Sequence, residues 1–203
     1  MITITQGYSL ENFSAETMFA DRKRLFVDLL GWELPTLEDR YEIDQFDGDH
    51  ATYIVDADTS GRHIGSLRLL PSEGPHILGN LFACLCDGTV PSGPDTMEIT
   101  RLCLPARLRA AGRLALRNRL ISAMVDYSLV NGITALTGLT SASFLQQICS
   151  MGWRSRSLGA PRWIGGDFLA AFCIELNADT PNRLATNGIY TPGTIAPATR
   201  QAA

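Results

Sequence analysis

The feature that most constrains this chain is an arginine on the apolar face of a predicted helix. Residues 10–30 follow an amphipathic helical pattern, and Arg22 lies inside its apolar stripe. The apolar side chains that share this stripe, at about 100° per residue, are Phe19, Phe26, Leu29 and Leu30. A guanidinium group keeps its proton, so a buried one requires carboxylates or a ligand anion around it. Asp44 and Asp47 follow in a polar segment and are the candidate partners. The alternative is an arginine whose head group reaches the rim of a core.

Arg22 begins a wider pattern of charged and aromatic residues. In order, its members are Arg22, Phe26 and Trp32 in the spacing R-x3-F-x5-W, Asp44 and Asp47 in D-x-x-D, Arg68 in GSLRLLP, and Glu98 and Arg101 in MEITRL. This pattern resembles that of the acyl-homoserine-lactone synthases, the bacterial autoinducer synthases of quorum sensing. The resemblance covers roughly residues 5–175. Each element is common by chance, whereas all of them in order at fitting separations form a specific signal.

The resemblance implies a mixed α/β fold similar to that of the N-acetyltransferases (GNAT-like), with a central, mostly antiparallel twisted sheet flanked by helices. A chain of 203 residues is long enough for one domain with a large core, and we expect residues 1–176 to form it. Residues 177–203 are polar and rich in Thr, Pro and Ala, and we expect a loosely ordered tail there. Arg109-Ala-Ala-Gly112 matches part of the acetyltransferase pyrophosphate loop, but Leu114 stands where a small residue is usual.

The local signals predict alternating strands and helices. Ser9 is the expected N-cap of the first helix, and Gly31 is expected to close it. Residues 33–49 are charged and poor in aliphatic side chains, which favours a mobile loop with at most a short helix. Strict alternation separates Glu98 from Arg101, so we expect a β-bulge or other irregular pairing between them. The remaining expected strands cover 2–5, 51–56, 63–70, 96–104, 133–139, 152–156 and 168–175, and the remaining helices cover 114–130 and 142–150.

Composition narrows the functional classes. The net charge is −4 and the mean hydropathy is close to zero, which fits a soluble protein and not a general nucleic-acid binder. No apolar run approaches the ~20 residues of a membrane span, and the N-terminal sequence carries no secretion signal, so a cytoplasmic location is expected. The five cysteines lack C-x-x-C spacing, which argues against a disulfide framework or a structural zinc site.

The family resemblance implies a reaction on S-adenosylmethionine. Its α-amine would attack an acyl thioester on acyl carrier protein or coenzyme A, and its carboxylate would then displace methylthioadenosine to close a homoserine lactone. Asp44 and Asp47 would hold the cationic groups of this substrate, while Arg22 or Arg68 would pair with its carboxylate. Three aromatic side chains, those of Phe26, Trp32 and Phe82, would pack on the adenine ring or the sulfonium.

Glu98, Arg101 and Arg68 are the expected catalytic residues. Glu98 would accept the proton of the attacking amine, directly or through a water, and Arg101 would orient it. The alternative for Glu98 and Arg101 is a structural ion pair on a sheet. No residue indicates a covalent acyl-enzyme, so direct transfer is expected, and we expect no metal and no cofactor besides the two substrates.

Two further groups of residues follow from the resemblance. The acyl chain would lie against Leu102, Thr137, Gly138, Thr140, Phe144 and Trp153, each of which has ordinary core packing as its alternative. Leu102 replaces an aromatic that is frequent in the family, so acyl length and oxidation stay open. An acidic helix of acyl carrier protein, or the phosphates of coenzyme A, would meet Arg107, Arg109, Arg113, Arg117 and Arg119. A solvated helix face is the alternative reading of these arginines.

Two rival functions remain at this point. An ordinary N-acyltransferase would acylate an amine without closing a lactone, and only the set around Trp32, Asp44 and Asp47 argues against it. An inactive paralogue would bind S-adenosylmethionine or acyl chains without turnover. Release of methylthioadenosine distinguishes the synthase from both.

Overall fold

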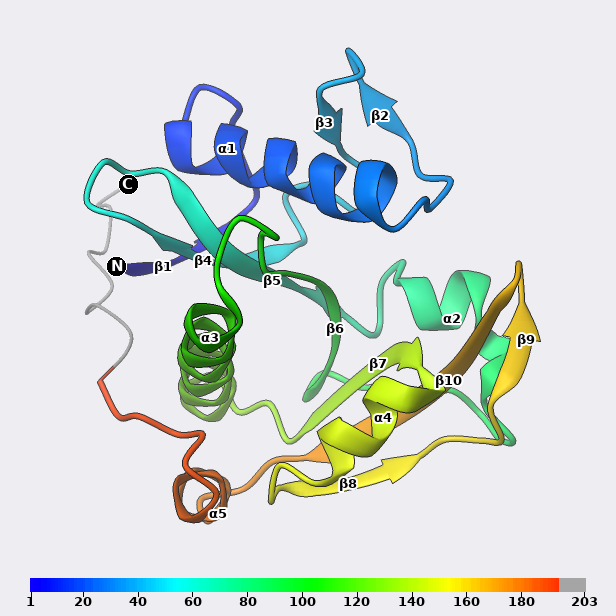
Figure 1. Ribbon diagram of the computed structural model, residues 1–203. Helices are drawn as coiled ribbons and strands as arrows, with labels where there is room; N and C mark the ends of the chain where they lie inside the picture. The colour runs from blue at the N-terminus through cyan, green and yellow to red at the C-terminus, as the bar shows by residue number, and fades with distance from the viewer. Residues whose placement is uncertain (194–203) are drawn as a thin grey trace. The chain divides into compact units, whose positions relative to one another are not determined.

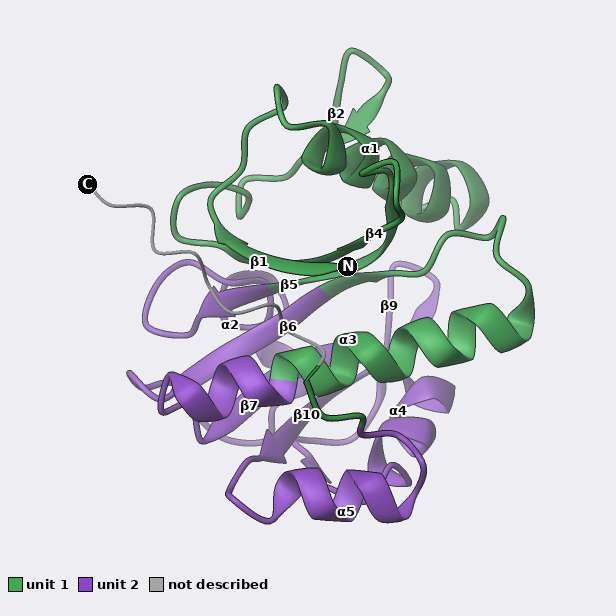
Figure 2. Ribbon diagram, turned by 90° about the vertical axis from the view of Figure 1, so that its left-hand side faces the viewer, with its two compact units in different colours: residues 1–68, 101–124, 191–203 green, residues 69–100, 125–190 purple. Residues whose placement is uncertain are grey.

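The computed structural model describes residues 1–193, and Figure 1 shows the path of the chain. Residues 1–176, for which we expected one domain, divide into two compact units. Of the described residues, unit 1 comprises 1–68, 101–124 and 191–193, and unit 2 comprises 69–100 and 125–190 (Figure 2). Three elements run from one unit into the other: β5 (His63–Pro71), β6 (Thr96–Cys103) and α3 (Ala110–Val130).

In unit 1 an antiparallel β-sheet is covered by the first helix. β1 (Ile2–Gln6) pairs with β4 (Thr52–Ala57) from Ile2 opposite Asp56 to Gln6 opposite Thr52, and β5 follows β4 in the sheet. α1 (Phe13–Arg22) lies along these strands (Figure 1), and its Phe19 ring meets Tyr53 of β4 edge to face. The strands expected at residues 51–56 and 63–70 are therefore confirmed as β4 and β5, which are neighbours in the sheet.

The first helix changes from α-helical to π-helical geometry before the end of the predicted apolar stripe of residues 10–30. α1 continues directly into a π-helix, η1 (Lys23–Leu29), and Gly31 closes it with φ 70°. A π-turn has more residues than an α-turn, so it rotates the following side chains off the 100° stripe. Phe19, Arg22 and Phe26 are buried as predicted, but Leu29 and Leu30 are exposed. Asn12, and not Ser9, caps the helix, because its side chain accepts from the N–H groups of the first turn.

The segment 33–49 contains a β-hairpin, which corrects the expected loop. β2 (Thr36–Leu37) pairs with β3 (Tyr41–Glu42), and Glu38 and Asp39 between them have φ values of 53° and 49°. Left-handed residues at both turn positions give a connection that suits the twist of a hairpin. Tyr41 is buried, and its hydroxyl donates to Glu16 of α1 over 3.0 Å. The hairpin is thereby fixed to the helix that carries Arg22.

Unit 2 is built around the central strand β10 (Asp167–Glu175). Its partner on one side is β7 (Ala135–Ser141), and β8 (Arg154–Ser157) and β9 (Arg162–Ile164) pair with it as well, all antiparallel. β6 pairs with β7 in parallel over residues 96–98. α4 (Ala142–Cys149) packs on the strands β7, β8 and β10 (Figure 1). The short α2 (Ile77–Leu81) and the 3₁₀ turn η2 (Ala83–Leu85) complete the unit before β6.

The mixed α/β architecture with mostly antiparallel strands confirms the predicted fold class. α3 starts at Ala110 and not at residue 114, and Gly132 closes it with φ 71°. Arg101 within β6 has φ 51°, a left-handed conformation that is uncommon for a residue with a side chain. The backbone is thus irregular at Arg101, and the expected β-bulge between Glu98 and Arg101 stays a prediction.

The tail from residue 177 is more ordered than expected. α5 (Thr180–Thr186) forms there and buries Leu184, and Ile189 behind it is buried too. The Tyr190 hydroxyl donates to Asp126 of α3 over 2.5 Å. Two buried apolar side chains within a polar stretch, those of Leu184 and Ile189, anchor this part of the tail. Residues 194–203, the rest of the predicted tail, lie outside the described part of the chain.

Two remaining expectations concern membranes and cysteines. Among residues 1–193, none of the helices combines the length and apolarity that crossing a bilayer demands. All five cysteines are free thiols, as predicted, with Cys103 and Cys173 buried.

Candidate active site

Arg22, the last residue of α1, is almost completely buried and is held by two carboxylates. Its Nε donates to Glu42 Oε2 over 2.6 Å, and its Nη1 and Nη2 each donate to an oxygen of Asp47 over 2.9 Å. The guanidinium group therefore has a two-pronged contact with Asp47 and a third bond to the hairpin residue Glu42. The prediction that a buried Arg22 needs carboxylates is confirmed.

Arg68 reaches the same carboxylates from β5. Its Nη1 and Nη2 donate to Asp44 over 2.7 and 3.0 Å, and Nη1 also lies 2.7 Å from Asp47 Oδ1. Arg101 approaches from β6, where its Nη2 donates to Asp44 Oδ2 over 2.7 Å and to Glu42 Oε1 over 3.1 Å. The left-handed backbone of Arg101 coincides with this contact, and such strain is typical of functional sites.

We call these six residues the central cluster: Arg22, Arg68, Arg101, Glu42, Asp44 and Asp47. Three guanidinium groups face three carboxylates, so the cluster is formally neutral, and all six belong to unit 1. The side chains of Arg22 and Arg68 are 1% exposed, whereas that of Arg101 is 10% exposed. Arg101 is thus the arginine of the cluster that solvent or a ligand reaches most readily.

Opposite charges shift the pKa values of Arg22 and Asp47 in the cluster. Burial opposes charge on Arg22, but Asp47 and Glu42 more than compensate and raise its pKa. Burial likewise tends to raise the pKa of Asp47, but Arg22 and Arg68 hold it well below its usual range. Tyr53 donates its hydroxyl to Asp47 over 2.8 Å, and burial together with this carboxylate raises its pKa far above that of a free tyrosine.

Glu42 is the member of the cluster that the sequence reasoning missed. It is fully buried and bonds both Arg22 and Arg101. A usable signal was present, because Glu42 precedes Asp44 by two residues and extends D-x-x-D to E-x-D-x-x-D. The carboxylate oxygens of Glu42, Asp44 and Asp47 lie within 4.8 Å of one another, a spacing that suits a cation. Arginine side chains fulfil that role here.

An aromatic pair lies beside the cluster. The rings of Phe26 and Trp32 are stacked with centroids 5.1 Å apart and planes 11° apart. The Arg101 guanidinium carbon lies 5.6 Å from the centre of the Phe26 ring. Phe26 is buried, while Trp32 remains 40% exposed. The pair therefore presents an accessible aromatic face next to Arg101. Phe82 belongs to unit 2, where it packs on Leu78 and Leu85, and its substrate-binding role stays a prediction.

Glu98 is buried in unit 2 and accepts two backbone hydrogen bonds. The N–H groups of Ile77 and Leu78, in the first turn of α2, donate to its two oxygens over 2.7 and 2.8 Å. This contact fixes the direction of the carboxylate. Because Arg101 belongs to unit 1, its expected action on Glu98 stays a prediction.

The expected acyl-pocket residues are divided between the units. Leu102 lies in unit 1, and the other five lie in unit 2. Thr137 is buried, and its Oγ1 lacks a hydrogen-bond partner within residues 1–193. A Cβ on Gly138 would lie 2.7 Å from the Phe172 ring, so this position tolerates no larger residue without rearrangement. Trp153 is buried and donates to the carbonyl of Ile148, whereas Thr140 and Phe144 are half-buried. Their role as pocket walls stays a prediction.

The five arginines expected to meet a carrier differ in their surroundings. Arg107 and Arg119 form ion pairs with Asp21 and Asp56, and Arg117 bonds the side chain of Asn118. Arg109 is exposed and Arg113 is half-buried near the start of α3. Part of the positive charge is thus already compensated within unit 1, and docking by this group stays a prediction.

A buried polar network beside Arg22 was not predicted. His63 Nδ1 lies 2.8 Å from Asp21 Oδ2, and His63 Nε2 lies 3.0 Å from Ser66 Oγ. All three side chains are buried. Burial lowers the pKa of His63, although Asp21 acts in the opposite direction. Asp21 and His63 lie 42 positions apart in the sequence, so no local spacing indicates their contact.

Comparison with known proteins identifies the chain. Residues 6–184 match the family model described as autoinducer synthase. The acyl-homoserine-lactone synthase of Ralstonia nicotianae is 32% identical over 172 residues, which cover 82% of this chain and 84% of that protein. The crystal structure of TofI in a ternary complex with an inhibitor and MTA superimposes with a TM-score of 0.76 at 27% identity, covering 96% of this chain and 99% of that one. A putative N-acetyltransferase of Lactobacillus plantarum, 18% identical over 87% of this chain and 99% of its own, shares the fold with a TM-score of 0.56. The chain therefore belongs to the autoinducer synthase family, the acyl-homoserine-lactone synthases, which are acyltransferases.

Proposed function

We propose that this protein acylates the α-amine of S-adenosylmethionine and then closes a homoserine lactone. In the first step the amine attacks the thioester carbonyl of an acyl donor. A C–N bond forms, the C–S bond breaks, and the amine loses a proton while the donor leaves as a thiol. In the second step the methionine carboxylate attacks the γ-carbon. A C–O bond forms, and the C–S bond to the sulfonium breaks to release neutral methylthioadenosine. The product is a quorum-sensing signal.

The observation that carries this proposal is the neutral central cluster. S-adenosylmethionine bears an ammonium, a sulfonium and a carboxylate close together, so its site needs groups of both signs. Arg101 and Asp44 form the more accessible edge of the cluster and bond each other over 2.7 Å. The substrate carboxylate would take the place of Asp44 on Arg101, and a substrate cation would take the place of Arg101 on Asp44. Because a carboxylate replaces a carboxylate and a cation replaces a cation, every charge in the site stays paired.

The inner half of the cluster stays in place during this exchange. Arg22 remains bonded to Asp47 and Glu42, and Arg68 remains bonded to Asp44 and Asp47. These residues position the exchanging pair and do not themselves need to release their partners. This refines the expectation that Arg22 or Arg68 binds the substrate carboxylate directly.

The stacked Phe26 and Trp32 rings supply the aromatic surface for the adenosyl group. Their geometry leaves the Trp32 face accessible for stacking with adenine or for a contact with the sulfonium. The TofI complex with MTA supports an adenosyl site in a chain 27% identical to this one. An ordinary N-acyltransferase has no need of such a surface.

Glu98 is the proposed acceptor of the amine proton. Its carboxylate is buried and is directed by the N–H groups of Ile77 and Leu78, and a carboxylate held in a fixed direction suits a general base. Arg101 and Arg68 are the proposed catalytic partners of Glu98. Arg101 would bind the substrate carboxylate, and Arg68 would hold Asp44 in position for the substrate cation. Both steps are displacements without net oxidation, so no cofactor or metal is required, and treatment with EDTA should leave the rate unchanged.

The acyl donor is a thioester of acyl carrier protein or coenzyme A. Both donors are acidic, and the exposed Arg109 is the clearest contact for either among the arginines near α3. The proposed place of action is the cytoplasm, where S-adenosylmethionine and acyl thioesters are both available. Nucleic acids and membranes have no part in this reaction.

Mass spectrometry of organic extracts tests the proposed function. The protein is expressed in a host that makes no lactones, alongside a folded Glu98→Gln variant. We expect a homoserine-lactone fragment ion from the wild type and at least about 100-fold less from the variant, which is typical of the loss of a general base. A wild type that yields no lactone in the host or with a panel of purified donors, while still binding S-adenosylmethionine, would favour an inactive ligand-binding paralogue.

A further inference from the structure

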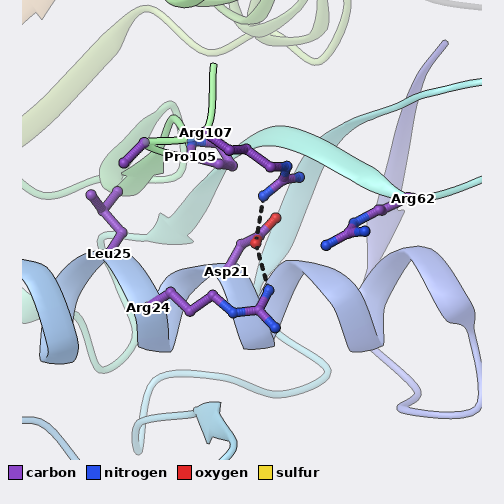
Figure 3. A pocket seen from close by; sticks show the side chains of 7 residues that line it. Asp21, Arg24, Leu25, Arg62, Pro105 and Arg107 are labelled. Carbon is purple, nitrogen blue, oxygen red and sulfur yellow. Dashed lines mark hydrogen bonds and ion pairs between the residues drawn. The ribbon is translucent and has the colours of Figure 1, made fainter. Parts of the chain in front are cut away.

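A pocket opens in unit 1 apart from the central cluster, and of its residues only Arg107 belongs to the group expected to meet an acyl carrier. It has a volume of about 290 Å³ and is lined by Asp21, Arg24, Leu25, Arg62, Pro105, Ala106 and Arg107. These residues come from α1, η1, the turn between β4 and β5, and the turn between β6 and α3. Figure 3 shows Asp21 between two arginines, with the Arg62 guanidinium directed toward it from the side. We call this site the Asp21 pocket.

Asp21 holds two of the three arginines in fixed positions. Its Oδ1 accepts from Arg24 Nη1 over 3.1 Å and from Arg107 Nη1 over 2.7 Å, while its Oδ2 faces His63. Arg107 also donates to the carbonyl of His63. Burial tends to raise the pKa of Asp21, but the hydrogen bonds from His63 and Arg107 outweigh it and lower the pKa. The carboxylate is therefore a charged anchor at the base of the pocket.

Positive charge exceeds negative charge in this pocket by two. Arg24, Arg62 and Arg107 contribute three positive charges, and Asp21 contributes one negative charge. No hydrogen bond of the Arg62 guanidinium is found within residues 1–193, although the carboxylate of Asp58, which accepts from the backbone N–H of Arg62, interacts with its charge. Guanidinium groups that gather around one carboxylate repel each other, and a bound anion would relieve this repulsion.

The donor geometry and the charge balance point to one class of anion. A phosphate group carries a charge of about −1.5 to −2 at pH 7 and three acceptor oxygens, which matches an excess of two charges and three guanidinium groups. A carboxylate supplies one charge and two acceptors. Arg24 and Arg107 are already immobilised by Asp21, so little side-chain entropy is lost on binding. Leu25, Pro105 and Ala106 form an apolar wall against which a carbon substituent can pack.

We infer that the Asp21 pocket binds a phosphate group, either free phosphate or the phosphate ester of a small metabolite. Arg62 closes onto the anion from its exposed position, while Arg24 and Arg107 form the preorganised base. This binding needs neither S-adenosylmethionine nor an acyl donor. It is independent of lactone synthesis, and either proposal can fail without the other.

Isothermal titration calorimetry with the full chain tests this inference. Inorganic phosphate and glycerol 3-phosphate are titrated separately at low ionic strength in a buffer without phosphate. We expect saturable binding at one site, weakened about 10-fold or more by Arg62→Ala, because a charge-assisted contact is lost. Arg24→Ala should have an effect of the same sign. The matched control is Arg162→Ala, which removes an exposed arginine of β9 outside the pocket and should leave the affinity unchanged.

The two ligands distinguish the sources of the phosphate group. Tighter binding of glycerol 3-phosphate supports an ester whose carbon part packs on the apolar wall, whereas equal affinities support a site for free phosphate. Absence of saturable binding to the folded wild type would overturn the inference. Equal affinity of wild type and Arg62→Ala would overturn it too, because the heat would then arise elsewhere on the molecule.

Discussion

The central cluster and the Asp21 pocket lie in the same compact unit and differ in how many carboxylates face their arginines. In the central cluster three arginines meet three buried carboxylates. In the Asp21 pocket three arginines surround one carboxylate, and two of their side chains, Arg24 and Arg107, are 62% and 36% exposed. Both use the same guanidinium–carboxylate contact. The difference indicates that charge balance, rather than the number of arginines, decides which ligand a site accepts.

A balanced, buried cluster suits a ligand that itself carries both signs, because each exchanged contact is replaced by an equivalent one. An unbalanced, open cluster suits an anion. The neighbouring residues Asp21 and Arg22 at the end of α1 belong to the two different sites, so one turn of helix supplies an anchor to each.

The largest expected effect follows from breaking the central cluster at its buried end. Arg22→Ala leaves Glu42 and Asp47 without their main partner, and an uncompensated buried charge costs about 3–5 kcal/mol. We expect urea denaturation to show a loss of this size in the free energy of unfolding. Arg24→Ala, two residues away and exposed, should cost less than about 1 kcal/mol. Similar losses for both variants would contradict the contrast between the two sites.

Glu42→Gln sharpens the comparison inside the central cluster. This change keeps the shape of the side chain but removes the charge that pairs with Arg22 and Arg101. A charge-assisted hydrogen bond contributes about 1.5–3 kcal/mol, so we expect kcat/KM for S-adenosylmethionine to fall by about 10- to 100-fold. The matched control is Glu11→Gln, which changes an exposed glutamate outside the cluster and should leave the rate unchanged. An unchanged rate in Glu42→Gln would mean that Arg101 functions without its ion pair to Glu42.

The smallest expected effect concerns pH and the network below the Asp21 pocket. The folded-state pKa of His63 is lowered, chiefly by burial, below its unfolded value of about 6.5. The folded state therefore binds fewer protons here than the unfolded state. The stability that this residue contributes is complete above pH of about 6.5 and is lost as the pH falls toward the lowered pKa.

Urea denaturation between pH 7.5 and pH 5.5, a range of about two units around that value, measures this loss. His63→Gln should show a weaker decline over the range than the wild type. His50→Gln, which changes an exposed histidine, should follow the wild-type curve. A steeper decline in His63→Gln would show that His63 is protonated in the folded protein and that the assignment is wrong.

The charged members of the central cluster, apart from Glu42, were predictable because each was a polar residue in an apolar setting or part of a recognisable spacing. Arg22, Asp44, Asp47, Arg68 and Arg101 all meet in the structure. Glu42 was not predicted because the segment around it was interpreted as a loop. In the structure, the left-handed residues Glu38 and Asp39 form the turn of a hairpin that includes Glu42. Turn residues other than glycine give only a weak signal of this kind.

Other features depend on contacts that no local pattern records. The π-helical winding after Arg22 turns Leu29 and Leu30 outward, against a periodicity that assumes an α-helix throughout. The Asp21–His63 contact joins distant positions. α5 follows from a few apolar side chains in a polar stretch, which composition averages away. The fold class survived these errors because it rests on the alternation of strands and helices over the whole chain.

The most direct test of the central claim is to count methylthioadenosine and acyl-homoserine lactone in one reaction. Purified protein is supplied with S-adenosylmethionine and an acyl donor, and both products are quantified by liquid chromatography and mass spectrometry. The account predicts equal amounts of the two products throughout the reaction. Acylated S-adenosylmethionine that accumulates without methylthioadenosine would contradict it, because the protein would then acylate an amine and leave the ring open.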